Sequence, residues 1–189
     1  MKYIVRIIFV FATAMLIKLF CLDIYCVPTA SMQPTIKIDD KILVQKCLFT
    51  PQKESVLAFR LPQNPDELYI KRCKGMPLDT VWIDANRNYQ IQKNVMQGID
   101  NAFFIIPKKG LKVKIDFKNI TFYKPLIERD EDGQIGVIGG QLYINGIVAQ
   151  EYTFQQNYYF MLGDNPNSSV DSRTFGVVGE GLMLGKMIF

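Results

Sequence analysis

An almost unbroken apolar run near the N-terminus constrains this chain most. It extends from Ile4 to Leu22 and is interrupted only by Arg6 and Lys18. As a helix, a segment of this length rises about 28 Å, close to the hydrocarbon thickness of a bilayer, and the two basic side chains near its ends can reach the headgroups. Lys2 and Arg6 favour a cytoplasmic N-terminus. The sequence therefore predicts a transmembrane helix, with the rest of the chain on the outer face of the membrane.

Two features of this leader also match other kinds of N-terminal segment. The stretch from Ile7 to Ile17 has the length of the apolar region of a cleaved signal peptide, but more apolar residues follow Lys18 and no small-x-small cleavage site lies nearby. A lipoprotein site at Cys21 is disfavoured by the bulky Leu19 and Phe20 before it. We therefore favour an anchor.

After Leu22 the pattern changes to short segments with period-two alternation, broken by proline and glycine, which is typical of β structure. An apolar content of 49% is ample for a buried core and argues against disorder. Asn145-Gly146 is the best hairpin turn, and helical periodicity beyond the leader is poor. The expected strands include residues 42–44, 56–59, 68–70, 111–117, 142–144, 147–148 and 158–162.

The segment of residues 81–156 is richer in lysine, asparagine and glutamine than its flanks, and it separates two regions that carry motifs. We interpret it as an insertion. The expected organisation has four parts: a cytoplasmic N-terminus and anchor (1–22), the first half of a core (23–80), an inserted β subdomain (81–156) and the second half of the core (157–189).

The charge balance is slight, with 22 basic and 18 acidic residues and a net charge of +4. This argues against a nucleic-acid partner. A loose lysine cluster fits a solvated strand face, with attraction to anionic lipid headgroups as the alternative. Its members are Lys108, Lys109, Lys112, Lys114, Lys118 and Lys124.

The cysteines show no C-x-x-C pair and the chain has no histidine, so we expect no metal site and no cofactor. The four cysteines are Cys21, Cys26, Cys47 and Cys73. Because Cys21 falls in the expected span, at least one of the other three is expected to be unpaired unless the chain dimerises through a bridge. Their connectivity stays open.

Ser31 follows the leader closely, in the sequence Ser31-Met32-Gln33-Pro34. Without histidine, a nucleophilic serine needs another base, and a lysine can serve if burial lowers its pKa enough to keep the amine neutral. Lys71 is the candidate because it follows the apolar segment of residues 68–70. From the pattern alone, a lysine at the end of an apolar strand is more often a surface residue.

Three motifs together resemble the successive conserved boxes of bacterial type I signal peptidases. The first spans Val27 to Thr35 (VPTASMQPT), the second spans Tyr69 to Pro77 (YIKRCKGMP) and the third spans Gly163 to Gly176 (GDNPNSSVDSRTFG). Their order and spacing match that family, as does the preceding apolar segment. The resemblance covers essentially the whole chain, although the inserted segment matches only in general character. It implies a mainly β fold, with an antiparallel catalytic sheet and a smaller inserted β domain.

The resemblance implies a Ser-Lys dyad. Ser31 would be the nucleophile that becomes acylated, and Lys71 would be the general base. The Ser31 amide and the Thr29 hydroxyl would bind the oxyanion, and Ser169 would orient the lysine amine. Asp171 and Arg173 match residues that pair to support the site, and Arg72 lies beside Lys71, where it can join them. Asp164 and Asn165 fit a tight turn that holds the last motif.

A peptide site is expected between two strand edges, one before Ser31 and one before Lys71. The residues assigned to it are Tyr25, Val27, Met32, Tyr69 and Ile70. The resemblance implies preproteins with a small-x-small motif as substrates, the lipid bilayer as a partner and, indirectly, the secretion translocon. It places the chain in the bacterial cytoplasmic membrane as a single-pass protein, with its catalytic part on the outer face.

Three positions depart from the family pattern. Asp39 and Leu78 stand where the family usually has glycine, and Pro166 stands where it usually has arginine. The first two replacements bear on local loop conformation, because a residue other than glycine is restricted in its backbone angles. A separate hypothesis places the Cys73 thiol near the Lys71 amine, with a small buried hydrophobe as the alternative.

The alternatives differ in substrate and in activity. A processing peptidase dedicated to conjugation or pilus substrates would share the chemistry. A catalytically inactive, membrane-anchored paralogue would bind signal peptides without cutting them. A self-cleaving SOS-type repressor also uses a Ser-Lys dyad, but it should begin with a DNA-binding helix-turn-helix rather than an apolar leader.

Overall fold

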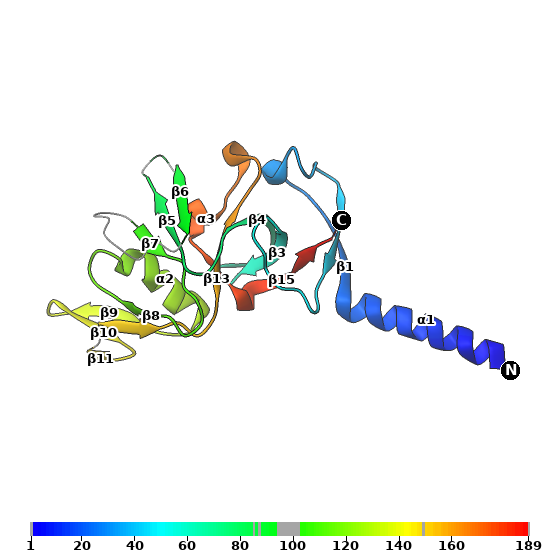
Figure 1. Cartoon of the computed structure of the whole chain (residues 1–189), viewed down its shortest axis with the longest axis horizontal. Coiled ribbons are helices and arrows are strands. Elements are labelled where there is room, and N and C mark those ends of the chain that lie inside the picture. The colour runs from blue at the N-terminus through cyan, green and yellow to red at the C-terminus, as the bar shows by residue number, and fades with distance from the viewer. Residues whose placement is uncertain (1, 85, 87, 94–102, 149, 189) are drawn as a thin grey trace.

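A single N-terminal helix projects from a β-rich body (Figure 1). The computed structural model describes residues 2–84, 86, 88–93, 103–148 and 150–188. The helix, α1 (Lys2–Cys21), exposes large apolar side chains such as Phe9 and Phe11. Within the described residues, no helix combines the length and apolar character needed to cross a membrane. The structure therefore does not show the transmembrane helix that the sequence predicts.

The body is built on a seven-stranded antiparallel sheet with strand order β1-β2-β15-β3-β4-β13-β14. This confirms the expected mainly β, antiparallel fold. The strands are β1 (Leu22–Cys26), β2 (Lys41–Gln45), β3 (Val56–Leu61), β4 (Asn64–Gly75), β13 (Tyr158–Leu162), β14 (Val178–Gly179) and β15 (Met183–Met187).

Apolar side chains cover both faces of this sheet because neighbouring residues along a strand point to opposite sides. In β3, Val56 and Ala58 belong to one buried cluster, whereas Leu57 and Phe59 belong to another. This two-sided burial explains why β3 reads as a continuous apolar run rather than as a clean alternation.

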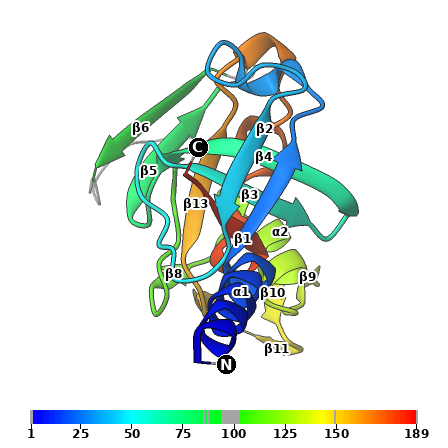
Figure 2. The same ribbon diagram turned by 90° about the vertical axis from the view of Figure 1, so that its right-hand side faces the viewer.

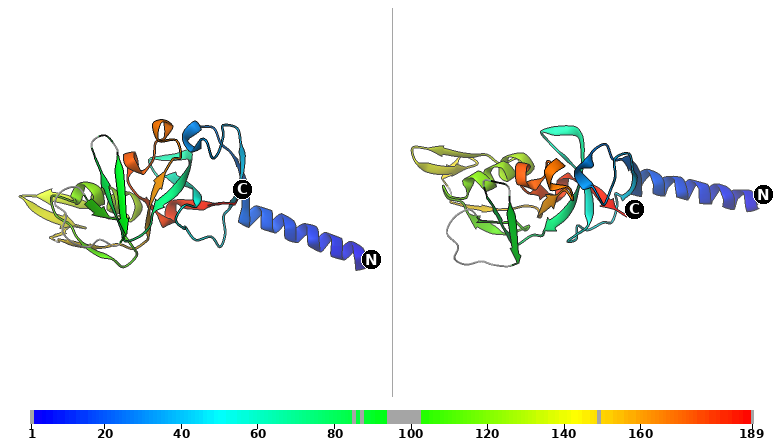
Figure 3. Two further views of the ribbon diagram at one scale, coloured as in Figure 1. Left: turned by 45° about the horizontal axis from the view of Figure 1, so that its top comes forward. Right: turned by 90° about the horizontal axis from the view of Figure 1, so that it is seen from above.

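Smaller sheets lie at the end of the molecule remote from α1, as Figures 1 and 3 show. Asn145 and Gly146 have φ values of 53° and 78°, and they connect β10 to β11 as the sequence predicts. The three sheets comprise β5 (Asp79–Ile83), β6 (Tyr89–Lys93) and β7 (Phe103–Ile105); β8 (Lys112–Lys114) and β12 (Glu151–Thr153); and β9 (Ile135–Ile138), β10 (Gln141–Ile144) and β11 (Ile147–Val148).

Two details of this region differ from expectation. The strand expected over residues 111–117 is limited to β8, because the Asp116 carboxylate accepts hydrogen bonds from the Lys118 and Asn119 amides and turns the chain. Helix α2 (Ile120–Asp130) was not predicted from the sequence. It contains Pro125, which usually ends a helix, yet it buries Tyr123, Leu126 and Ile127 and is stabilised by that packing.

Short helical turns complete the fold. They are η1 (Ala30–Met32), η2 (Pro166–Ser168), α3 (Ser172–Phe175) and η3 (Glu180–Leu182). The blue loop that contains η1 and the orange loop that contains η2 lie side by side at one edge of the body (Figure 2). Two segments far apart in the sequence therefore meet there.

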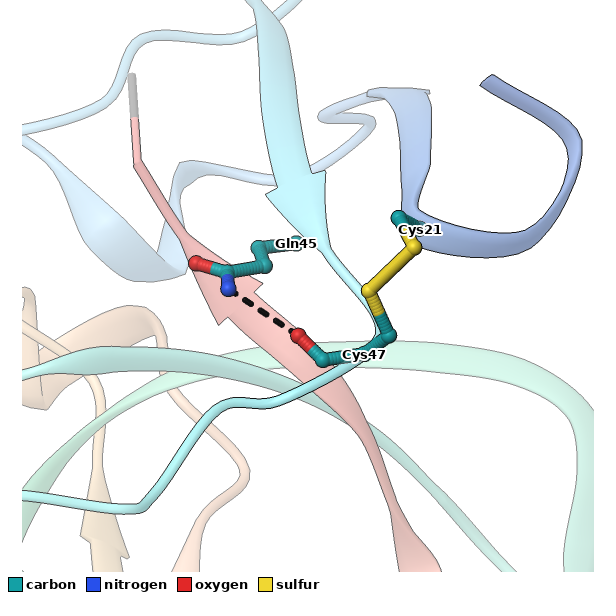
Figure 4. The surroundings of a disulfide bond; sticks show 3 residues. All are labelled: Cys21, Gln45 and Cys47. Carbon is teal, nitrogen blue, oxygen red and sulfur yellow. Dashed lines mark hydrogen bonds between the residues drawn. A yellow bond between two sulfur atoms is a disulfide. The ribbon is translucent and has the colours of Figure 1, made fainter. Parts of the chain in front are cut away.

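A disulfide joins the end of α1 to the segment after β2 (Figure 4). It links Cys21 to Cys47, whose carbonyl also accepts a hydrogen bond from Gln45 Nε2 at 2.9 Å. The expectation that Cys21 is unavailable within a span was wrong, because α1 ends at this residue and β1 begins at the next one. Cys26 and Cys73 are free.

Candidate active site

Ser31 lies in η1, just beyond the end of β1. Its neighbours Val27 and Met32 are buried in the core cluster on one face of the sheet, and they hold the turn against it. Ser31 itself is only 5% exposed. The packing of its neighbours therefore fixes the place of the hydroxyl.

Lys71 comes from the middle of β4 and reaches this hydroxyl. Its Nζ lies 2.9 Å from Ser31 Oγ and also donates to the Ile70 carbonyl at 3.0 Å. The side chain is buried, and burial lowers the pKa of Lys71 to about 8, although the charges of Asp171 and Glu67 raise it in part. A lysine with this pKa supplies a neutral amine at mildly alkaline pH, as a general base must.

Thr29 also contacts the serine hydroxyl. Its Oγ1 donates to Ser31 Oγ at 3.2 Å, and the Thr29 side chain lies at the exposed mouth of the site. The oxyanion role implied by the resemblance needs this hydroxyl to turn from Ser31 towards a bound carbonyl. Such a change requires a different χ1 rotamer of Thr29, which is an exposed residue.

The third motif holds the serine loop through its backbone. The Asn165 amide donates to the Ser31 carbonyl at 3.0 Å, and Asn165 Nδ2 donates to the Ala30 carbonyl at 3.1 Å. A Cβ on Gly163 would lie 2.6 Å from the Ser31 carbonyl oxygen and 2.6 Å from Ser169 Cβ. Only glycine fits between the nucleophile loop and Ser169.

Ser169 Oγ is buried and has no hydrogen-bond partner within normal geometry, although the hydroxyl is close enough to Asp171 to lower the pKa of that carboxyl. A buried hydroxyl without a partner is uncommon. Ser169 Oγ therefore makes no hydrogen bond to the Lys71 amine in this structure, and its orienting role stays a prediction.

Two arginine–aspartate pairs lie among the residues around the site. Arg173 pairs with Asp171 through contacts of 2.8 and 2.7 Å, and Asp171 also accepts from the Gly163 amide at 3.1 Å. Burial raises the pKa of Asp171, but its hydrogen bonds outweigh burial and lower the pKa overall. Arg72 binds Asp164 at 2.8 and 2.6 Å, so the expectation that it joins Asp171 and Arg173 was wrong.

Ser31 and Lys71 open onto a cleft of about 390 Å³. Its walls are residues 26–29 and 66–71, with Ser168 and Val170 at one end. Of the residues assigned to peptide binding, Val27, Met32, Tyr69 and Ile70 line the cleft. Tyr25 does not; it packs against the buried cluster around Val27.

The departures from the family pattern keep the backbone that glycine favours. Asp39 has a φ of 67° and Leu78 a φ of 74°, both in the left-handed region. Both residues therefore adopt a backbone conformation that costs a side chain other than hydrogen steric strain. At the third position, the Pro166 carbonyl accepts a hydrogen bond from the Arg173 guanidinium at 3.1 Å.

Cys73 is fully buried, with Sγ 3.6 Å from both the Gly75 carbonyl and Met76 Sδ. Burial raises the pKa of its thiol to about 12. These surroundings are those of a small buried hydrophobe. The closeness of this thiol to the Lys71 amine stays a prediction.

Sequence reasoning missed the groups that position Tyr69. Phe59 and Phe175 contact its ring, and Glu67 accepts a hydrogen bond from its hydroxyl at 2.7 Å. Phe175 lies within the third motif, but nothing in its spacing indicates a partner in β4.

Among the described residues, no group of three histidine, cysteine, aspartate or glutamate side chains is arranged to hold a metal ion.

Comparison with known proteins identifies the family. The model of the family described as "Signal peptidase, peptidase S26" matches residues 1–189. Signal peptidase I of Buchnera aphidicola subsp. Schizaphis graminum is 29% identical, over 93% of this chain and 70% of its own length. Signal peptidase I of Aquifex aeolicus is 27% identical, over 98% of this chain and 81% of its own length.

A crystal structure of a signal peptidase I from Enterococcus faecalis V583 is also similar. It is 23% identical, covers 73% of this chain and 97% of its own chain, and has a TM-score of 0.35. With the family model matching the full chain, the chain belongs to the signal peptidase family, peptidase S26, and is a serine peptidase.

Proposed function

We propose that this chain is a membrane-anchored endopeptidase that removes signal peptides from exported preproteins by a Ser31–Lys71 dyad. The observation that carries the proposal is the 2.9 Å contact between Lys71 Nζ and Ser31 Oγ, made by two buried side chains in a protein without histidine. The relatives named signal peptidase I support the substrate class.

The reaction begins with a neutral Lys71 amine. As Ser31 Oγ attacks the scissile carbonyl carbon, Lys71 accepts the serine proton, and the oxyanion is bound by the Ser31 amide and the Thr29 hydroxyl. Collapse of this intermediate breaks the C–N bond, and the Lys71 ammonium gives its proton to the leaving amine. Neutral Lys71 then activates a water that hydrolyses the acyl-enzyme and restores Ser31.

The surroundings of the amine support this role. The Ile70 carbonyl holds Lys71 Nζ at 3.0 Å on one side, and Ser31 Oγ lies on another. We propose that Ser169 provides a further contact that orients the lone pair. Arg72, Asp164, Asn165, Asp171 and Arg173 hold the loops around the dyad and take no part in bond breaking.

Substrate binding follows from the two walls of the cleft. An extended peptide between residues 26–29 and 66–71 would form backbone hydrogen bonds with the strand edges, while alternate side chains enter shallow apolar sites. Val27, Met32, Tyr69 and Ile70 would line those sites. We propose that small side chains occupy these sites, as in preproteins with a small-x-small motif.

The membrane location is proposed from α1. Its exposed apolar side chains, including Phe9, Val10 and Phe11, gain free energy when removed from water. We propose a single pass through the bacterial cytoplasmic membrane, with the N-terminus in the cytoplasm and the catalytic part outside, near the translocon. The Cys21–Cys47 disulfide supports an oxidising location for the body.

The four-part organisation is likewise a proposal. The strands of the seven-stranded sheet come only from residues 22–75 and 158–187, and the smaller sheets come from residues 79–153. This arrangement supports a split core (23–80 and 157–189) with an insertion (81–156), after an anchor (1–22).

Cleavage of a preprotein by the detergent-solubilised chain tests the function. The wild type is expected to release the mature protein, and Ser31→Ala and Lys71→Ala are each expected to be inactive while still folded. Full activity in Ser31→Ala would exclude the mechanism, whereas full activity in Lys71→Ala would exclude only the assigned base. A wild type that cuts only pilus or conjugation substrates, or binds without cutting, would favour one of those alternatives.

A further inference from the structure

Three aromatic rings form one contact group behind the cleft. Tyr69 stacks on Phe59, with ring centroids 5.5 Å apart and planes at 14°. Phe175 packs edge-on against both rings, 5.6 Å from Tyr69 and 6.0 Å from Phe59. Because Tyr69 lines the cleft and directly precedes Ile70 and Lys71, the place of the Phe175 ring helps to set the position of this wall.

Phe175 is in turn held by helix α2, which lies beside α3 (Figure 1). Arg129, in the last turn of α2, donates to the Phe175 carbonyl at 3.1 Å and to the Val177 carbonyl at 2.7 Å. The intervening Gly176 has a φ of 80°, a left-handed turn that glycine adopts without strain. Two hydrogen bonds from one guanidinium therefore fix the backbone on both sides of this turn.

The guanidinium has little freedom to move. Arg129 pairs through Nε and Nη2 with the carboxylate of Asp130, and the two side chains are 12% and 0% exposed. A planar guanidinium can bind one carboxylate and two carbonyls at once, whereas a lysine ammonium cannot reproduce that fork. Gln156 Nε2 also donates to the Asp130 carbonyl at 2.9 Å.

We propose that Arg129 and Phe175 are positioning residues for peptide binding, because they hold the Tyr69 wall of the cleft in place. Helix α2 lies in the inserted segment of residues 81–156, so this segment acts on the cleft without touching the peptide. The Ser31 loop is held by further contacts that do not involve Arg129, from Asn165 to Ser31 and from Gly163 to Asp171, although the Phe175 amide itself donates to the Asp171 carbonyl at 3.1 Å. Loss of the Arg129 contacts therefore weakens binding more than it slows bond breaking.

The inference rests on the proposed function, and three variants test it. Arg129→Gln removes the charged fork, Arg129→Lys keeps the charge without the fork, and Phe175→Leu keeps an apolar side chain without the ring edge. Lys124→Gln is the matched control, since Lys124 lies on the same helix and makes an exposed contact with Glu128. Melting temperatures and serine-acylation stoichiometry give the fraction of folded, competent enzyme.

Two readouts separate binding from chemistry. The first is KM and kcat for peptide cleavage, and the second is the dissociation constant of the uncleaved peptide in a Ser31→Ala background. Arg129→Gln and Phe175→Leu are expected to raise KM and the dissociation constant about tenfold, with kcat within about twofold and an unchanged pH midpoint. Arg129→Lys should fall between these variants and the wild type, and Lys124→Gln should match the wild type.

A purely structural role for Arg129 and Phe175 would lower the competent fraction but leave KM and the dissociation constant unchanged, and that result overturns the inference. If Phe175→Leu does not fold, KM and the dissociation constants of the two Arg129 variants test the inference. A wild type that binds the peptide without cutting it disproves the proposed function, while the dissociation constants still test the positioning role. Absence of binding by the wild type overturns both.

Discussion

The second half of the proposed core, residues 157–189, and the proposed insertion, residues 81–156, each contain a buried arginine–aspartate pair, but the two pairs make different further contacts. In the core, Asp171 binds Arg173 and also the amide of Gly163, which lies against the Ser31 loop. In the insertion, Arg129 binds Asp130 and then the carbonyls on either side of Gly176. The first pair therefore contacts the segment that lies against the Ser31 loop, and the second contacts the segment that carries Phe175.

The difference shows that similar interactions can be assigned to chemistry or to binding only by following their further contacts. Both pairs are buried and bidentate, so their own geometry does not separate them. Paired substitutions in the two regions should therefore have similar effects on stability and different effects on catalysis.

The largest contrast is expected between two glycines. In Gly163→Ala the new methyl group meets the Ser31 carbonyl and Ser169, neither of which can move away freely, so activity should fall by about 10³-fold and stability by about 2 to 4 kcal/mol. In the insertion, Gly136→Ala meets no atom within 4 Å and should leave both unchanged. Cleavage rates and urea unfolding measure the two effects. Near-wild-type activity in Gly163→Ala would show that the contact is not needed.

The two aspartates give the next contrast. Asp171→Asn and Asp130→Asn should each destabilise the fold by about 3 kcal/mol, because a buried arginine loses its carboxylate. The Asp171 charge raises the pKa of Lys71, so its removal lowers that pKa, and the rise of kcat/KM with pH should have its midpoint at a lower pH than in the wild type. Asp130→Asn should leave this midpoint in place.

The pH profile of kcat/KM measures that shift. The contribution of Asp171 to the free energy of unfolding also depends on pH. Because the pKa of Asp171 is lowered in the folded state, this contribution is present above about pH 4 and is lost as the pH falls below that value. An Asp171→Asn midpoint equal to that of the wild type would mean that this carboxylate does not influence the base.

The disulfide should stabilise the core and not the insertion. It closes a sequence separation of 26 residues around β1, η1 and β2, which corresponds to about 3 kcal/mol of lost chain entropy in the unfolded state. Cys47→Ser should therefore speed amide exchange in β1 and β2 but leave β9 and β10 unchanged. Cys26→Ser, at a free and exposed cysteine, is the control and should keep the wild-type melting temperature. Equal acceleration across the insertion would indicate one cooperative unit.

The smallest effects are expected at the left-handed positions. Leu78→Gly, at the junction between the core and the insertion, should stabilise the fold by about 1 kcal/mol, because leucine adopts a φ of 74° only with strain. Asp39→Gly, in the core loop, should gain less, since aspartate tolerates this region better. Thermal unfolding measures both, and a loss of stability in Leu78→Gly would mean that the packing of its side chain outweighs the strain.

Local sequence pattern was informative where local forces decide the structure. The alternation and turn residues predicted the β10–β11 hairpin, and the apolar runs predicted β3 and β13. Helix α2 was missed because Pro125 argues against a helix, whereas burial of Tyr123, Leu126 and Ile127 stabilises it. β8 is shorter than its alternation suggests because the Asp116 side chain forms a turn.

The candidate site shows the same limit. The resemblance indicated that Ser31 and Lys71 belong together, and the structure brings them into contact. The partner of Arg72 and the contact between Arg129 and the Phe175 carbonyl depend on how distant segments pack in three dimensions, and no local pattern encodes them. Tyr25 alternates with Val27 in the sequence, yet only Val27 lines the cleft.

The direct passage from α1 into β1 limits how far the loop that carries Ser31 can lie from the end of α1. Leu22 follows Cys21 without a linker, and the disulfide to Cys47 ties the junction to the edge of the sheet. β1 then extends about 17 Å towards the loop that carries Ser31. With α1 held in a bilayer, Ser31 would lie at a fixed distance from the lipid surface. The protein would then cut a peptide bond presented at that distance and would leave bonds nearer to the lipid or farther from it intact.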